Sequence, residues 1–127
     1  PAAMGAWAAT LETGTPFHGR KVISISGDGG LGQYLADFTT WVKYDMNITH
    51  VVLNNSELGK ISKEQRSAEW DVWQTDLVNP SFAAYAELCG GLGIRVTEAD
   101  EMKGALERAF AHDGPSLVEV ITDAELV

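Results

Sequence analysis

The sequence predicts an α/β domain, in which a three-layer α/β/α arrangement surrounds a mostly parallel sheet. Four short apolar runs rich in β-branched residues are separated by stretches with helical spacing. The apolarity within these runs is mostly continuous rather than alternating, which is typical of strands covered on both faces. Because strands and helices alternate, neighbouring strands should run parallel. The chain has 127 residues, 45% of them apolar, and we expect a single domain over 1–127.

The expected strands are short, and each is rich in valine, isoleucine or leucine. They lie at residues 22–25, 48–53, 94–96 and 117–121. A helix-like stretch at 2–9 opens the chain without an initiator methionine. We interpret that opening as a sign that sequence upstream has been removed.

The helices are expected between the strands. Helical spacing after the first strand is carried by Tyr34, Phe38, Trp41 and Val42. Two further helices are expected at 82–88 and 101–111. The segment 67–79 has no clean period and carries two tryptophans among polar residues, which indicates a mobile flap or a partner contact.

Charge and composition exclude several classes of protein. The formal net charge of −9 repels phosphate backbones and anionic lipids, so we expect no nucleic-acid partner and no electrostatic membrane docking. No apolar stretch reaches the length of a membrane span, and the N-terminus does not resemble a secretory signal. Cys89 is the only cysteine, which rules out an internal disulfide and fits a cytoplasmic location. An acidic domain that binds phosphate must use backbone amides or a bridging cation.

A glycine-rich turn, Gly27-Asp28-Gly29-Gly30, directly follows the first expected strand and precedes a helix. Such turns bind phosphate in α/β domains because glycines let the backbone approach an anion and the following helix presents its N–H groups. Taken alone, the same turn is equally compatible with a plain connection between a strand and a helix.

The spacing of Gly27, Gly29 and Gly32 also fits the G-x-G-x-x-G fingerprint of dinucleotide-binding domains. That fingerprint requires an acidic residue near the end of the second strand, where this chain has Asn54-Asn55. An aspartate inside the turn would also repel an uncompensated pyrophosphate. The dinucleotide-binding interpretation is therefore disfavoured.

Asp28 is better explained as a ligand of a hard cation. Mg²⁺ prefers oxygen ligands and bridges carboxylates to phosphate oxygens. The carboxyl ends of neighbouring parallel strands open into one crevice, so Asp28 after the first strand can meet Asn55 after the second. A simple turn at Asn54-Asn55 is the alternative, since asparagine is common in turns.

Taken together, Gly27-Asp28-Gly29 and Asn54-Asn55 resemble the signature of the thiamine-diphosphate-dependent superfamily of pyruvate oxidase and acetolactate synthase. The resemblance continues through 53–59, 86–96 and 112–120, and looks most like pyruvate oxidase and quinone-linked pyruvate dehydrogenase. It implies a thiamine-diphosphate-binding fold, and identifies the chain as the C-terminal domain that holds the diphosphate and Mg²⁺ in a longer enzyme.

The resemblance also implies roles for particular residues. Mg²⁺ would be ligated by the side chains of Asp28 and Asn55 and by the main-chain carbonyl of Glu57. The positions that would contact the cofactor are Gly27, Asp28, Gly29, Gly30, Asn55, Glu57, Leu58 and Gly59. Glu64 matches a glutamate that reaches toward the reacting carbon, although an ordinary surface glutamate is the alternative. Lys60 departs from the aromatic residue that the oxidases tend to carry.

The implied activity is decarboxylation of a 2-keto acid such as pyruvate. In the oxidase branch a middle domain, absent here, holds FAD. A pyrimidine-binding domain of a neighbouring subunit completes the site, so the full-length protein should be a homo-oligomer and this chain alone inactive. The alternatives are an acetolactate synthase, a 2-keto-acid decarboxylase, or a non-catalytic stand-alone domain for cofactor binding or dimerisation. Hydrolase chemistry lacks a nucleophile-elbow sequence, and the three histidines receive no role.

Overall fold

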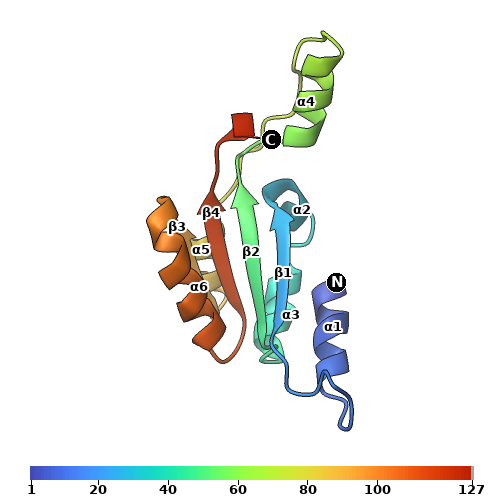
Figure 1. Cartoon of the computed structure of the whole chain (residues 1–127), viewed down its shortest axis with the longest axis vertical. Coiled ribbons are helices and arrows are strands. Elements are labelled where there is room, and N and C mark those ends of the chain that lie inside the picture. The colour runs from blue at the N-terminus through green and yellow to red at the C-terminus, as the bar shows by residue number, and fades with distance from the viewer. Residues whose placement is uncertain (127) are drawn as a thin grey trace.

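The computed structural model describes residues 1–126 and contains one four-stranded sheet (Figure 1). Its strands are β1 (Val22–Gly27), β2 (Ile48–Asn54), β3 (Leu92–Val96) and β4 (Ser116–Ile121). They are ordered β1-β2-β4-β3, and every neighbouring pair is parallel. The predicted α/β class, the parallel sheet and all four strands are therefore confirmed.

Helices connect the strands, as the alternating pattern predicts. They are α1 (Ala2–Thr10), α2 (Asp28–Gly32), α3 (Asp37–Lys43), α4 (Gly59–Ser67), α5 (Phe82–Leu88) and α6 (Met102–Ala111), with short 3₁₀ turns η1 (Ala99–Glu101) and η2 (Ala124–Leu126). The helical stretch after β1 is divided into α2 and α3. The turn between them is closed by backbone hydrogen bonds from Tyr34 to Leu31 and from Asp37 to Tyr34.

The sheet separates two apolar clusters. On one face, α6 packs Ala105 and Ala109 against Val51, Ile94 and Val118. The larger cluster lies on the other face, beneath α2, α3 and α5, and consists of Leu31, Phe38, Trp41, Met46, Ile48, Val52, Phe82, Ala86 and Leu117. These two layers of helices and the sheet between them form the expected α/β/α arrangement.

The expectation that every strand is covered on both faces is wrong for β1. Burial alternates along this strand, and Ile23 and Ile25 are 51% and 68% exposed. The reason is that β1 is an edge strand and that α6 packs over β3 and β4 at the far side of the sheet. Ile23 and Ile25 therefore form an uncovered apolar strip beside β2 in the structure of this chain.

His50 on β2 is buried, and neighbouring side chains hold its ring in place. Its Nδ1 lies 2.6 Å from Ser24 Oγ and its Nε2 lies 3.0 Å from Ser26 Oγ, while the Trp41 ring packs beside it. Burial lowers the pKa of His50 to about 4. The imidazole is therefore neutral in the folded protein at neutral pH.

The lowered pKa of His50 predicts a loss of stability in mild acid. The unfolded chain takes up a proton near pH 6.5, whereas the folded chain resists protonation until about pH 4, so the free energy of unfolding falls as pH drops between these values. Between pH 7 and pH 5 we expect His50 to account for a decrease of about 2 kcal/mol. Urea unfolding at both pH values would measure it, and His50→Gln should remove this part of the decrease. An equal decrease in the variant would contradict the assignment.

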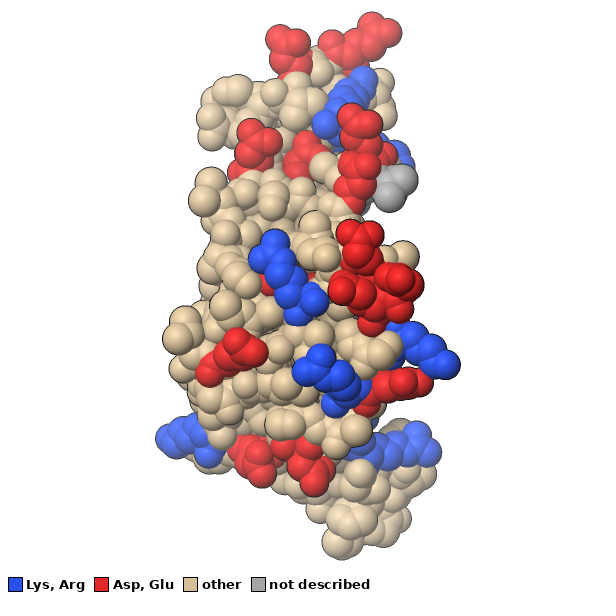
Figure 2. Space-filling model, turned by 90° about the vertical axis from the view of Figure 1, so that its left-hand side faces the viewer, with Lys and Arg blue, Asp and Glu red and all other residues tan. Residues whose placement is uncertain are grey.

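The surface is mixed in charge and apolar in places. Figure 2 shows Asp and Glu side chains along the length of one face, with Lys and Arg side chains lying between them. None of the helices within residues 1–126 is long and apolar enough to cross a membrane. Beyond the sheet, α4 projects at the top of Figure 1, and Trp70 and Trp73 in the segment after it are each 71% exposed.

Candidate functional site

The loops that follow β1 and β2 meet at Asp28, as the parallel sheet predicts. Asp28 begins α2 and is 3% exposed. Its Oδ1 accepts a hydrogen bond from the Gly29 amide at 2.9 Å. Its Oδ2 accepts from the Ser56 amide at 2.8 Å and from Asn79 Nδ2 at 2.7 Å. One carboxylate therefore joins the glycine-rich turn, the loop that follows β2 at Asn54-Asn55 (the Asn-Asn loop) and the segment that leads into α5.

A cavity of about 340 Å³ opens at this end of the sheet. Its lining residues are Gly27, Asp28, Leu53, Asn55, Glu57, Gly59, Lys60, Thr122 and Asp123. The structure thus brings together most of the residues that the sequence assigned to cofactor and metal binding. Thr122 and Asp123 were not predicted. They follow β4, which is the other neighbour of β2 in the sheet, so strand order is the signal that would have found them.

Glycine has two different uses in this turn. A Cβ added to Gly29 would lie 2.8 Å from Leu58 Cδ2, so a side chain there would require the Leu58 side chain to move. A Cβ on Gly27 would meet no atom within 4 Å, which leaves the backbone at Gly27 open to the cavity. Leu58 thus packs against the turn, Gly27 leaves its backbone accessible, and Gly59 is among the residues that line the cavity.

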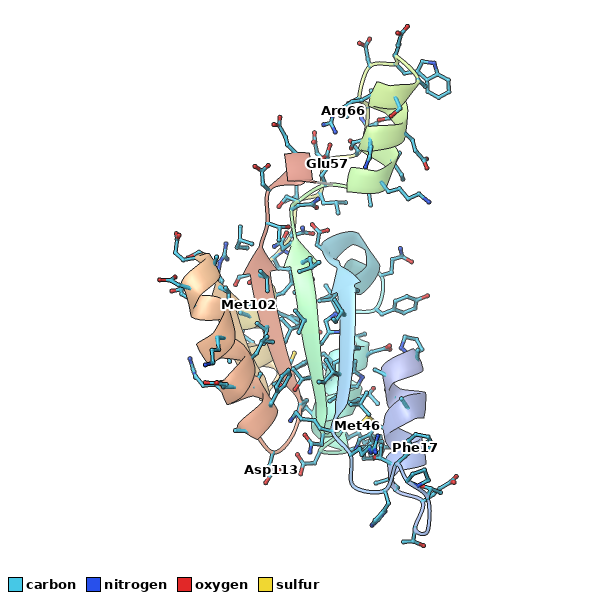
Figure 3. The ribbon with its side chains drawn as sticks, viewed as in Figure 1. Phe17, Met46, Glu57, Arg66, Met102 and Asp113 are labelled. Carbon is cyan, nitrogen blue, oxygen red and sulfur yellow. The ribbon has the colours of Figure 1, made fainter. Side chains whose placement is uncertain are left out.

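The Asn-Asn loop is shaped by its own side chains. Asn55 Oδ1 accepts a hydrogen bond from the Glu57 amide at 3.1 Å, which closes a turn. Glu57 also forms an antiparallel bridge with Asp76 through the Ser56 carbonyl and the Leu58 amide, so the bridge does not use the Glu57 carbonyl. The Glu57 side chain pairs instead with Arg66 of α4 at 3.3 Å (Figure 3).

Glu64 lies apart from these residues. It is on α4, its side chain is 67% exposed, and its carboxylate is 3.9 Å from Lys60 Nζ. The structure does not place Glu64 among the residues that line the cavity. Its role near the reacting carbon stays a prediction.

The oxygen donors of the cavity suit a Mg²⁺ ion that also binds phosphate and water. They do not form a metal site made entirely of protein ligands. Within residues 1–126 no cluster of three or more His, Cys, Asp or Glu side chains is placed to hold a metal ion. Asp28 and Asn55 supply two side-chain oxygen donors, and Mg²⁺ commonly uses one or two protein carboxylates together with phosphates and water. The cavity also contains Glu57 and Asp123, with Lys60 as the cation among its lining residues. These carboxylates repel an anionic ligand unless a bridging cation or backbone amides offset their charge.

Behind Asp28 lies a set of polar side chains that sequence reasoning missed. Asn79 Nδ2 donates to Asp28 and also to Asn54 Oδ1 at 3.0 Å. Asn54 Nδ2 in turn donates to Glu119 Oε1 at 2.9 Å. Glu119 is fully buried on β4. Nothing in the local sequence marks Asn79 or Glu119, because their contacts join positions far apart in the chain.

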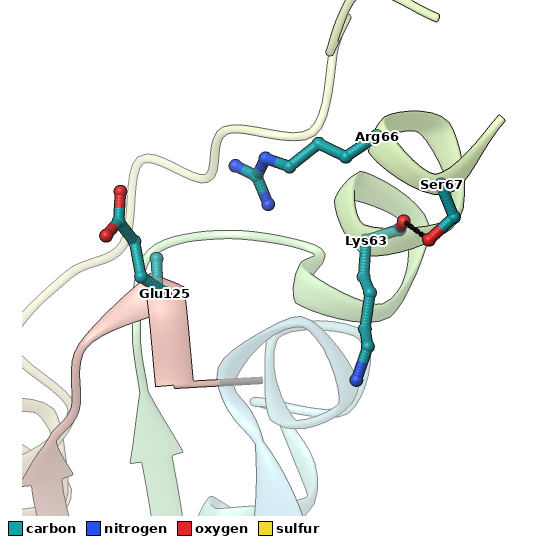
Figure 4. A pocket seen from close by; sticks show the side chains of 5 residues that line it. Lys63, Arg66, Ser67 and Glu125 are labelled. Atoms are coloured by element: carbon teal, nitrogen blue, oxygen red, sulfur yellow. Dashed lines mark hydrogen bonds between the residues drawn. The ribbon is translucent and has the colours of Figure 1, made fainter. Parts of the chain in front are cut away.

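A second cavity, of about 370 Å³, lies between α4 and η2. Lys63, Arg66 and Ser67 line it from α4, and Glu125 stands on the other side (Figure 4). The Ser67 hydroxyl is held by the Lys63 carbonyl at 2.7 Å, and Arg66 already pairs with Glu57. These groups stabilise α4 and its attachment to the Asn-Asn loop.

Comparisons with known proteins agree with this arrangement. Residues 1–120 match the family model described as the C-terminal TPP-binding domain of thiamine pyrophosphate enzymes. YdaP of Bacillus subtilis, described as a thiamine pyrophosphate-containing protein, is 38% identical over 96% of this chain and 23% of its own length. The mitochondrial acetolactate synthase catalytic subunit of Aspergillus candidus is 32% identical over 99% of this chain and 17% of its own length.

A solved structure is also similar. The thiamine diphosphate-dependent 4-hydroxybenzoylformate decarboxylase of Rhodococcus jostii matches with a TM-score of 0.84 and 27% identity. The match covers 97% of this chain and 22% of that protein. The chain thus spans roughly a fifth of the length of the relatives that it matches.

Proposed function

Because this chain belongs to the thiamine pyrophosphate enzymes as their C-terminal TPP-binding domain, we propose that it holds the diphosphate of thiamine diphosphate through a bridging Mg²⁺ ion. Asp28 and Asn55 supply side-chain oxygens to the ion, and Glu57 supplies its main-chain carbonyl. The observation that carries this proposal is the meeting of Asp28 and Asn55 on the wall of one cavity, beside the open backbone of Gly27.

The backbone around the turn would complete the diphosphate site. The amides near Gly29 and Gly30 are proposed to donate to the diphosphate, and Gly59 also lines the cavity. The Gly29 amide donates to Asp28 Oδ1 in this structure, so its first task is to orient that carboxylate. Leu58 packs on Gly29 and keeps the two loops together. Thus the protein positions its oxygen ligands before any cation arrives.

We propose that the longer protein decarboxylates a 2-keto acid. When bound, thiamine diphosphate supplies the electron sink for this chemistry. Within this chain, Glu64 is the proposed catalytic glutamate, and the residues of the cavity orient the cofactor and exclude water from the diphosphate. The pyrimidine-binding domain of a neighbouring subunit would supply the rest of the site, so the working form would be a homo-oligomer. The single cysteine supports a reducing compartment such as the cytoplasm.

Pyruvate is our first choice of substrate, in a pyruvate oxidase or quinone-linked pyruvate dehydrogenase that carries FAD on another domain. The segments 53–59, 86–96 and 112–120 support it. Acetolactate synthase is the second choice, supported by similarity to the Aspergillus candidus subunit, and a decarboxylase is the third, supported by similarity to the Rhodococcus jostii enzyme. Product analysis of the full-length protein, supplied with pyruvate and a quinone as electron acceptor, separates them. Acetate formed with reduction of the quinone indicates oxidation, acetolactate indicates the synthase, and acetaldehyde indicates simple decarboxylation.

The cofactor site is tested by calorimetric titration of the full-length protein with thiamine diphosphate, with and without Mg²⁺. We expect binding that requires Mg²⁺ and is lost in EDTA. Asn55→Ala should weaken Mg²⁺-dependent binding by at least about 10-fold, because it removes an oxygen ligand and the acceptor that closes the loop. Ser67→Ala on α4 is the control, since its hydroxyl bonds only within the helix. Binding that is indifferent to Mg²⁺, or to Asn55→Ala, would refute the proposal.

A further inference from the structure

We propose that Glu119 is a positioning residue, which orients the Mg²⁺ ligand Asp28 through Asn54 and Asn79. The inference rests on the proposed function and extends it to a residue that does not touch the ion. Glu119 is fully buried on β4, and Arg95 Nη1 lies 3.8 Å from its Oε2, which is beyond hydrogen-bond distance. A buried carboxylate in such a place is costly, and its hydrogen bonds explain its presence.

One oxygen of Glu119 is fixed by the start of α5. Oε2 accepts from the Ala83 amide at 3.1 Å and from the Ser81 hydroxyl at 3.3 Å. Oε1 therefore remains for Asn54, whose Nδ2 donates to it at 2.9 Å. Because a carboxylate only accepts hydrogen bonds, Asn54 must turn its amino group toward Glu119 and its carbonyl oxygen away from it.

The orientation of Asn54 then decides what Asp28 receives. Asn54 Oδ1 accepts from the Ser56 amide at 3.2 Å and from Asn79 Nδ2 at 3.0 Å. The same two donors hold Asp28 Oδ2, at 2.8 Å and 2.7 Å. If Asn54 were reversed, its amino group would face both donors, and the loop and Asn79 would have to move. Glu119 thus favours the orientation of the Asn54 amide that accepts from the same two donors as Asp28.

Glu119→Gln tests this series of hydrogen bonds because it keeps the size of the side chain and turns one of its two acceptors into a donor. It also removes the negative charge that faces Arg95. The glutamine oxygen can keep the Ala83 amide and the Ser81 hydroxyl, but its amino group then faces the amino group of Asn54. Asn54 must reverse, and Asp28 loses its fixed donors. We expect the Mg²⁺ affinity of the full-length protein, measured by calorimetry with saturating thiamine diphosphate, to fall about 10- to 100-fold.

The double variant Glu119→Gln/Asn54→Asp restores the polarity. The carboxylate introduced at position 54 accepts from the glutamine amino group at position 119 on one side, and from Ser56 and Asn79 on the other. We expect the double variant to recover most of the lost Mg²⁺ affinity. Asn79 lies in a half-buried loop, so Asn79→Ala removes its hydrogen bonds to Asp28 and Asn54 without altering the core. This variant should also weaken Mg²⁺ binding. A role of Glu119 in folding alone predicts no recovery and no effect of Asn79→Ala on Mg²⁺.

Ser116→Ala is the matched control on the same strand. Ser116 is fully buried and bonds to Thr49 Oγ1 at 2.8 Å, far from Asp28. Its loss should lower the melting temperature and leave the Mg²⁺ affinity unchanged. Unchanged Mg²⁺ affinity in Glu119→Gln or in Asn79→Ala, or a double variant no better than Glu119→Gln, would overturn the inference. If Asn55→Ala also leaves Mg²⁺ binding intact, the proposed function itself fails; if only the Glu119 and Asn79 variants do, the positioning role alone fails.

Discussion

Asp28→Ala is expected to abolish Mg²⁺-dependent binding of thiamine diphosphate by the full-length protein. Changes outside the ligand shell of a metal lower affinity by about 10- to 100-fold, so removal of a charged ligand should lower it by at least about 100-fold. The substitution also removes the acceptor of the Gly29 amide, and it leaves the Ser56 amide and Asn79 Nδ2 with Asn54 Oδ1 as their remaining acceptor. Calorimetric titration with Mg²⁺ at saturating cofactor measures the loss.

Asp28→Asn separates the charge of Asp28 from its shape. The amide keeps one oxygen for the surrounding donors, so the variant should unfold at a higher temperature than Asp28→Ala. Mg²⁺ affinity should nevertheless fall strongly in both, because the cation loses the negative charge that it pairs with. In EDTA, the wild-type protein should bind the cofactor no more tightly than either variant, because its carboxylate then repels the diphosphate. Strong Mg²⁺-dependent binding by Asp28→Asn would show that the carboxylate is not a ligand.

The fold was predictable from the sequence because its signals are local. The strand at 48–54 carries a run of three apolar residues, Val51 to Leu53, and is buried along most of its length. The strand at 22–27 carries a similar signal and is exposed on one face, since burial depends on strand order and on where α6 packs. Strand order is set by long-range pairing, which no local pattern contains.

The candidate site likewise contains some residues that the sequence predicts and others that depend on strand order. Asp28 and Asn55 could be predicted because each follows a strand and parallel strands end at a common edge. Asp123 enters the cavity because β4 lies next to β2, and Glu119 reaches Asn54 from the middle of an apparently ordinary apolar strand. Glu64 was predicted from the family resemblance, and the structure places it exposed on α4, outside the residues that line the cavity.

Gly93→Ala is expected to destabilise the protein by about 3 kcal/mol, at the upper end of the usual effect of overpacking. A Cβ on Gly93 would lie 2.0 Å from the Ala83 carbonyl oxygen and 2.7 Å from its carbonyl carbon. Both atoms belong to the α5 backbone, so relief requires the helix to move away from β3. The movement would also pull the Ala83 amide from Glu119, which links this contact to the candidate site. Urea unfolding measures the change.

Gly104→Ala provides the opposite case within the same chain. Gly104 lies in α6, and a Cβ there would meet no atom within 4 Å. Because alanine restricts the unfolded chain and favours helix, this variant should gain about 0.5–1 kcal/mol. The sequence 90–93 contains three glycines, and only the approach of α5 shows why Gly93 tolerates no side chain. If Gly93→Ala were as stable as Gly104→Ala, the close packing of α5 on β3 would be refuted, and with it the geometry that places the Ala83 amide beside Glu119.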